Sequence, residues 1–202
     1  HAKPPRALIS TLNSVANEAF ELFFALLALL ALVGSLAIVV ARFAGGRAGR
    51  SLVAGLVPLR FAVPALVTSV SMLGSLYFSE AVGYRPCVLC WYQRICLYPW
   101  SVILGIAAWR RDAAIKIYAI PVLCISIVIS AYHSWIQWFP PSTGTSFCTA
   151  DAPCTTKFVN EFDFVTLPFM ALSAAVFMIA LLLASDPSDS DFEITEEVEV
   201  TA

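Results

Sequence analysis

Apolar residues fill five long stretches of the chain, and polar and charged residues separate these stretches. Each stretch approaches the roughly 20 apolar residues that a helix needs to cross the hydrocarbon core of a bilayer. The pattern predicts an all-α integral membrane protein with short connections and no water-soluble domain. The expected spans are residues 22–41, 61–79, 91–109, 117–140 and 164–185, and only the third contains a charged residue, Arg94.

The two ends of the chain differ from these spans. Residues 1–21 carry apolar positions at helical spacing, which favours either an interfacial helix leading into the first span or an extension of that span. Residues 186–202 are rich in Asp, Glu and Ser, and we expect them to form an acidic, disordered tail in solvent.

The composition supports the membrane interpretation. Hydrophobic residues make up 59% of the chain and charged residues 13%, whereas a soluble domain usually has about 45–50% and about 25%. The net charge of −2, from 12 basic and 14 acidic residues, provides no basic surface for a polyanion. These values argue against a disordered, collagen-like or nucleic-acid-binding protein.

The distribution of Lys and Arg predicts the orientation of the spans, because cytoplasmic connections carry an excess of these residues. With the N-terminus outside, the dense basic runs at residues 42–60 and 110–116 are cytoplasmic, and so is the acidic tail. The inner basic residues are then Arg42, Arg47, Arg50, Arg60, Arg110, Arg111 and Lys116, and the outer ones are Lys3, Arg6, Arg85, Arg94 and Lys157.

The six cysteines fall into two groups in this topology. Two of them, Cys96 and Cys124, lie inside spans, where we expect buried packing residues, as free cysteines usually are. The other four lie on the outer side of the membrane, in an oxidising compartment. They are Cys87 and Cys90, just before the third span, and Cys148 and Cys154, in the loop before the fifth.

Cys87 and Cys90 form a Cys-Val-Leu-Cys motif at the expected start of a helix. Two intervening residues allow a disulfide, and the partial positive charge of a helix N-terminus favours a thiolate. Arg94 follows one turn later on the same helix face. An arginine within a span is costly and marks a functional site by default. A redox site is therefore favoured over a structural disulfide with a snorkelling arginine.

Cys148 and Cys154 lie in the longest outer connection between spans, from about residue 140 to 163. We expect this pair to be mobile and exposed, the labile kind of disulfide that a partner thiolate attacks. The alternative is a structural disulfide that only stabilises the loop. His133 lies near the outer end of the fourth span at the level of Arg94, although a lone histidine is more often a satisfied buried residue.

Metal and haem chemistry fit these residues less well. Covalent c-type haem needs a histidine after the second cysteine, where the chain has Trp91. Four thiolates suit zinc only if both outer loops converge, and such a site leaves Arg94 without a role. We therefore expect no metal.

These motifs resemble those of the disulfide bond formation protein B (DsbB) family, and most closely its BdbC-type branch. The resemblance covers about residues 61 to 183. It is carried by Pro-Cys-Val-Leu-Cys-Trp-Tyr-Gln-Arg at 86–94, His-Ser-Trp-Ile-Gln at 133–137, Cys148 and Cys154, and Leu-Pro-Phe at 167–169. It implies a DsbB-like four-helix transmembrane bundle over residues 57–185, to which residues 22–41 add one extra N-terminal helix.

The resemblance also implies a function. Proteins of this family reoxidise a thioredoxin-fold thiol oxidase (DsbA/BdbD-like) outside the plasma membrane and pass its electrons to a membrane quinone, menaquinone or ubiquinone. Carried over, the site residues are Cys87, Cys90, Cys148 and Cys154 for disulfide exchange, with Cys148 in the mixed disulfide, and Arg94, His133 and Cys90 at the quinone, which the Cys90 thiolate contacts.

Two features depart from the family's pattern, and the residues also allow three other kinds of protein. The extra first span has no counterpart in the four-helix bundle, and Cys148 and Cys154 are close together, unlike the widely separated pair of the enteric branch. A vitamin K epoxide reductase-like enzyme is disfavoured because its CxxC follows the loop pair. A transporter is disfavoured because the spans lack paired carboxylates. A non-catalytic membrane subunit with structural disulfides remains the alternative.

Overall fold

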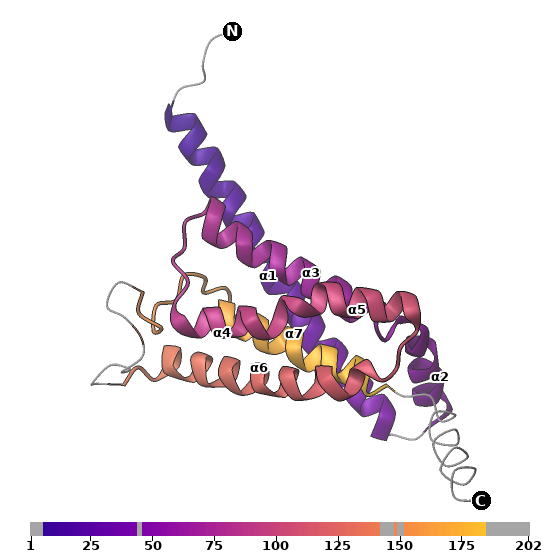
Figure 1. The fold of residues 1–202 in the computed structure, drawn as a ribbon. Coiled ribbons are helices and arrows are strands. Elements are labelled where there is room, and N and C mark those ends of the chain that lie inside the picture. The colour runs from indigo at the N-terminus through magenta and orange to yellow at the C-terminus, as the bar shows by residue number, and fades with distance from the viewer. Residues whose placement is uncertain (1–5, 44–45, 142–147, 149–151, 185–202) are drawn as a thin grey trace, which may run out of the picture.

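The computed structural model describes residues 6–43, 46–141, 148 and 152–184 (Figure 1). Regular structure in these residues is helical, apart from one antiparallel bridge between Glu161 and Val165. The elements are α1 (Arg6–Phe43), α2 (Arg47–Leu56), the 3₁₀ turn η1 (Val57–Leu59), α3 (Ala62–Leu76), the π-helical turn η2 (Tyr77–Ala81), α4 (Val88–Leu97), α5 (Pro99–Arg110), α6 (Ile115–Trp138) and α7 (Leu167–Leu182). The predicted all-α class is confirmed for this part of the chain. The tail expected at 186–202 lies outside the described residues.

The protein is a multi-pass membrane protein. Three of the described helical segments are long and apolar enough to cross a bilayer: Asn13–Phe43, Ala62–Ala81 and Ile115–Trp138. Helix α7 is apolar but has only 16 residues, fewer than the roughly 20 of a full span. Of the five expected spans, the first, second and fourth are thus found at full length, the fifth is shorter, and the third is divided.

The divided span consists of α4 and α5, which follow one another in the same general direction (Figure 1). Pro99 is the first residue of α5, where its missing N–H is tolerated. Tyr98 keeps helical dihedral angles, φ −60° and ψ −41°, so the chain continues without a loop. The chain stays largely apolar on both sides of Pro99, from Ile95 to Trp109, which is why the sequence predicted one helix there.

Helix α1 is continuous from Arg6 to Phe43. Of the two possibilities for the N-terminal segment, the described residues therefore show an extension of the first span. One face of α1 packs against α7, where Gly34 lies against the ring of Phe177. The opposite face leaves large apolar side chains such as Val33 and Leu36 uncovered, as expected for a helix in contact with lipid.

Helix α7 lies between α6 and α1, and α6 packs in turn against α4 (Figure 1). Buried apolar side chains of α3, α5, α6 and α7, among them Trp100, Leu104, Leu123 and Met178, form the main core. The basic residues Arg110 and Lys116 lie where α5 ends and α6 begins. The opposite end of the bundle, where α4 begins and α6 ends, holds the cysteines.

Candidate functional site

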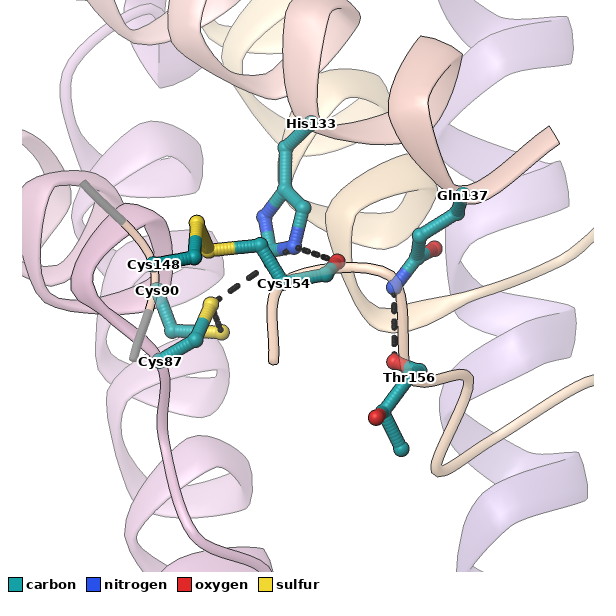
Figure 2. Close-up of a disulfide and its surroundings, with 7 residues drawn as sticks. All are labelled: Cys87, Cys90, His133, Gln137, Cys148, Cys154 and Thr156. Atoms are coloured by element: carbon teal, nitrogen blue, oxygen red, sulfur yellow. Dashed lines mark hydrogen bonds between the residues drawn. A yellow bond between two sulfur atoms is a disulfide. The ribbon is translucent and has the colours of Figure 1, made fainter. Parts of the chain in front are cut away.

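Four cysteines gather at this end of the bundle (Figure 2). Cys87 is the N-cap residue of α4, with extended backbone, and Cys90 lies in the first turn of the helix. Cys148 and Cys154 belong to the connection between α6 and α7. All four take part in one apolar cluster, to which α6 contributes Ile136. The fold thus brings together two pairs that are far apart in the sequence.

The two pairs differ in redox state. Cys148 and Cys154 are joined by a disulfide, with their Cα atoms 5.9 Å apart. Cys87 and Cys90 are thiols, and their Sγ atoms share a hydrogen bond at 3.2 Å. A disulfide places its sulfur atoms about 2.05 Å apart, so these two need to approach by about 1 Å to bond.

The loop disulfide is less exposed than the sequence suggested. Cys154 is 1% exposed, because residues 152–156 turn back into the end of the bundle and pack Cys154 against Cys87 and Ile136. The prediction of an exposed pair is therefore wrong for Cys154. Cys148 remains partly exposed, which makes its Sγ the more accessible sulfur of the disulfide.

His133 connects the two pairs. Its side chain points from α6 toward the disulfide and is 1% exposed (Figure 2). The ring Nε2 lies 3.0 Å from the backbone carbonyl oxygen of Cys154 and 3.7 Å from the Sγ of Cys87. A carbonyl oxygen only accepts, so Nε2 carries the proton and donates it. One turn later, the Gln137 Nε2 donates a hydrogen bond to the Thr156 carbonyl at 3.0 Å and anchors the same returning segment.

The environment of Cys87 favours its thiolate. The hydrogen bond from Cys90 is the largest influence and lowers the pKa of the Cys87 thiol, burial opposes this, and His133 lowers the pKa further. The position at the N-terminus of α4 acts in the same direction. The sequence placed the reactive thiolate on Cys90, whereas this arrangement places the negative charge on Cys87. That Cys90 reacts with the acceptor stays a prediction.

A cavity of about 120 Å³ opens on the other side of Cys90, and Arg94 lines it. The Arg94 Nε donates to the Ser75 Oγ and Nη2 donates to the Ser75 carbonyl, both at 3.1 Å. The guanidinium also lies over the rings of Trp91 and Tyr98. The two hydrogen bonds to Ser75 use two of the five N–H donors of the side chain, and the others remain to bind an oxygen atom in the cavity.

The cavity combines apolar walls with a few polar groups. Its walls include Phe24, Phe78 and Leu97, and its polar groups include Gln93 and Tyr84. Such a lining suits a mainly apolar molecule that is oriented by a small number of polar atoms. His133 does not line this cavity; it lines a small hollow beside Cys87 and Cys90 instead. The structure therefore brings Cys90 and Arg94 together, and His133 with Cys87.

Sequence reasoning missed several residues of this site. Gln93 stands three positions after Cys90 in the quoted motif, so helical spacing alone could have placed it on the same face. Its Nε2 donates to the Ser130 Oγ at 3.0 Å. Ser75 and Phe24 carry no such signal, because only the tertiary arrangement of α3 and α1 around the cavity brings them there.

The thiols and the imidazole also form a cluster of metal-ligand type. One ligand atom each from Cys87, Cys90 and His133 lies within 4.8 Å of the others. A site of four thiolates is excluded in this redox state, because Cys148 and Cys154 are bonded to each other. The absence of a metal from the working site stays a prediction.

The two cysteines within helices have different environments. Cys96 is buried at 9% exposure, so the prediction of a packing residue is confirmed for it. Cys124 is exposed, so the same prediction is wrong there. Helix α6 packs against α7 and α4 and leaves the face with Cys124 uncovered.

Comparison with known proteins gives consistent matches. Residues 58–185 match the family "Disulfide bond formation protein DsbB". The chain is 43% identical over 117 residues to disulfide bond formation protein C of Bacillus subtilis, which covers 58% of this chain and 85% of that protein. It is 43% identical over 120 residues to the probable disulfide formation protein C of Halalkalibacterium halodurans, which covers 58% and 88%. No solved structure matches the chain.

Proposed function

The chain belongs to the disulfide bond formation protein DsbB family, and from this premise we propose that it oxidises the dithiol of a thioredoxin-fold partner and passes the electrons to a membrane quinone. A role in disulfide bond formation, as a membrane thiol-disulfide oxidoreductase, follows from the family. What we propose beyond this role is the electron donor, a thioredoxin-fold protein, and the electron acceptor, a quinone.

One observation carries the proposal: the groups that it needs lie in a continuous order. The partly exposed Cys148 is bonded to the buried Cys154, which shares a cluster with Cys87 and Cys90. Cys90 in turn lines the cavity that contains Arg94. Electrons entering at Cys148 thus have a path of adjacent sulfur atoms to the cavity.

The first step is exchange with the partner. A thiolate of the reduced partner attacks the Cys148 Sγ, the bond to Cys154 breaks, and Cys154 leaves as a thiolate that takes up a proton. The second partner thiol then loses its proton and attacks the partner's own sulfur in the mixed disulfide, which releases Cys148. The partner has lost two electrons and two protons, and Cys148 and Cys154 hold them as two thiols.

The second step moves the electron pair inward, in a protein whose Cys87 and Cys90 form a disulfide. A thiolate of the loop pair attacks Cys87, the bond between Cys87 and Cys90 breaks, and the remaining loop thiol resolves the intermediate. The products are the Cys148–Cys154 disulfide and two thiols at Cys87 and Cys90, which is the combination that the structure contains. His133, next to Cys87 and the Cys154 carbonyl, holds the two pairs in register.

The cavity beside Cys90 fits a quinone head group, since it has apolar walls for the ring and a cationic donor for a ring oxygen. A quinone supplies, when bound, an acceptor for the two electrons and two protons of the reduced Cys87 and Cys90. Arg94 directs positive charge into the cavity, where it stabilises negative charge on an oxygen atom. Cys87 and Cys90 return to the disulfide.

The cysteine-bearing end then faces the extracytoplasmic side of the plasma membrane. This orientation is supported by basic residues at or beside the helix ends at the other end of the bundle, namely Arg47, Arg110, Arg111 and Lys116. The partner oxidase, which acts on exported proteins, is on the same side.

The test is quinone reduction by the purified protein in detergent, with a reduced thioredoxin-fold partner as donor and menaquinone or ubiquinone as acceptor. We expect turnover in the unaltered chain and none in Cys90→Ser or Cys148→Ser. The matched control is Cys124→Ser, which changes a cysteine on the exposed surface of α6 and should keep full turnover. Absence of turnover with either quinone, in protein with all four site cysteines, contradicts the proposal and favours a non-catalytic membrane subunit with structural disulfides.

A further inference from the structure

Helix α1 lies outside residues 58–185, the part of the chain that matches the family, yet its side chains contact both α3 and η2. The ring of Phe24 lies so close to Gly74 that a Cβ atom on residue 74 would overlap it. Phe20 stacks on Tyr77 with the ring centroids 4.5 Å apart, and the Tyr77 hydroxyl donates to the Asn17 Oδ1 at 2.9 Å. These contacts fix the position of α1 along the bundle.

The same face of α1 reaches the cavity beside Cys90. Phe24 is part of the cavity wall. The Tyr84 hydroxyl donates to the Glu21 carboxylate at 2.6 Å, and Tyr84 itself lines the cavity. Burial and the neighbouring Glu21 raise the pKa of Tyr84 to about 12, so this hydroxyl stays protonated and keeps the hydrogen bond. One helical turn of α1 thus contributes Phe24 to the cavity wall and Glu21 to hold the lining residue Tyr84 in place.

A second cavity, of about 350 Å³, continues from the first between α1, α3 and α7. The two cavities share Phe24, Ser71 and Met170 in their linings. The second cavity is lined by apolar side chains from α1 and α3, such as Leu27, Ala31, Val67 and Val70. None of its lining residues is charged. It lies within the segments of α1 and α3 that are apolar enough to cross a membrane.

We propose that this second cavity binds the isoprenoid tail of the quinone and that α1 is the helix that encloses it. The inference rests on the proposed function. A head group in the first cavity carries a long apolar chain. The adjoining second cavity, called the tail groove below, offers that chain a continuous apolar surface. Lipid chains are as apolar as the groove, so burial alone does not select an occupant. The tail is favoured because its attachment to the head group raises its local concentration at the groove.

The direct test is photo-crosslinking on the full, unaltered chain. The probe is a quinone with a photoreactive group in its isoprenoid tail, and mass spectrometry locates the adducts. We expect adducts on α1 near Leu27 and Ala31 and on α3 near Val67 and Val70, reduced by an excess of unlabelled long-tailed quinone. Adducts confined to the outer faces of α5 and α6, or adducts reduced only by phospholipid, would overturn the proposal.

A pair of variants on α1 provides the second test. Ala31→Phe fills the groove, whereas Val33→Phe adds the same ring on the uncovered face of the helix. We expect Ala31→Phe to raise the ratio of the KM for long-tailed quinone to the KM for a short-tailed analogue by about fivefold, a loss of about 1 kcal/mol. We expect Val33→Phe to leave this ratio unchanged.

The outcomes separate the two proposals. An unchanged ratio in Ala31→Phe overturns the tail groove while leaving quinone reduction intact. Failure of the unaltered chain to reduce either quinone overturns the proposed function, and the tail groove with it.

Discussion

The guanidinium of Arg94 is held by Ser75 and stacked on two aromatic rings, and it lies within the apolar part of the bundle. A charged side chain among apolar helices is costly, and it usually has a function, such as binding a polar or charged group of a substrate. In the proposed function, that group is the acceptor oxygen beside Cys90. The residue therefore acts on one half of the reaction, and its contribution is separable from thiol exchange.

Replacing Arg94 by Gln should lower quinone reduction by about a hundredfold, the size of effect seen when a donor to a developing negative charge is removed. Oxidation of one equivalent of reduced partner by the oxidised protein, measured without quinone, should stay near the unaltered rate. Equal loss of both activities would show that Arg94 supports the fold rather than the acceptor.

The second residue-scale prediction concerns the charge on Cys87. Its pKa is lowered by the hydrogen bond from Cys90 and, less strongly, by His133. The thiolate should therefore persist at pH values where an ordinary thiol is protonated, and disappear only as the pH falls through the lowered pKa. His133→Leu removes one stabilising contact and should shift the titration to higher pH.

The measurement is the ultraviolet absorbance of the thiolate against pH, with Cys148–Cys154 kept oxidised and Cys87→Ser as the blank. His133→Gln keeps an N–H donor toward the Cys154 carbonyl, so the segment around Cys154 should stay in place in that variant. A titration that is identical in the unaltered protein and in His133→Leu would remove His133 from this role.

At the scale of elements, the contact between α1 and α3 depends on the absence of a side chain at Gly74. Gly74→Ala introduces a methyl group against the Phe24 ring and should destabilise the protein by about 1–3 kcal/mol, as overpacking usually does. Gly74→Ala combined with Phe24→Ala should be less destabilised than the sum of the two single variants, because the clash is relieved. Thermal unfolding in detergent measures all three, and strict additivity would contradict the contact.

The hydropathy pattern predicted some features of the helices and missed others. The apolar stretches located α1, α3 and α6, because a bilayer imposes a minimum length on each span. The break before Pro99 was missed, since neither the hydropathy nor the helical backbone conformation changes there; only the missing N–H of Pro99 interrupts the helical hydrogen bonds. The packing of α1 on the cavity was also missed. It depends on Phe24 fitting against Gly74, and nothing in either local pattern pairs these two residues.

For the whole molecule, the sequence identified the reactive groups better than their surroundings. The four site cysteines, Arg94 and His133 stand out because paired cysteines on the outer side, a cation within an apolar span and a histidine at its level are unusual in a chain with few polar residues. The returning segment 152–156 determines whether Cys154 is exposed. It also determines whether His133 lies beside Cys87 or in the Arg94 cavity. That segment is positioned by tertiary hydrogen bonds such as the one from Gln137.

The orientation of the molecule leads to a labelling prediction. With Cys124→Ser as background, Glu80→Cys lies at the cysteine-bearing end and Asp112→Cys at the opposite end, and both positions are exposed. A membrane-impermeant thiol reagent applied to intact cells should label Glu80→Cys and should label Asp112→Cys only after permeabilisation. The reverse result would invert the topology and place the cysteine pairs in the cytoplasm.

The coexistence of a disulfide and a dithiol in one cluster also gives the protein a storage capacity. Each pair holds two electrons, so one chain accepts four before it must discharge, and the structure corresponds to the half-filled state. A chain with both disulfides formed should oxidise two equivalents of partner without any acceptor, the second more slowly because the inner pair is already full. In the proposed function, partner oxidation therefore continues for one further equivalent when the quinone pool is reduced, and the supply of disulfides is buffered against short interruptions of respiration.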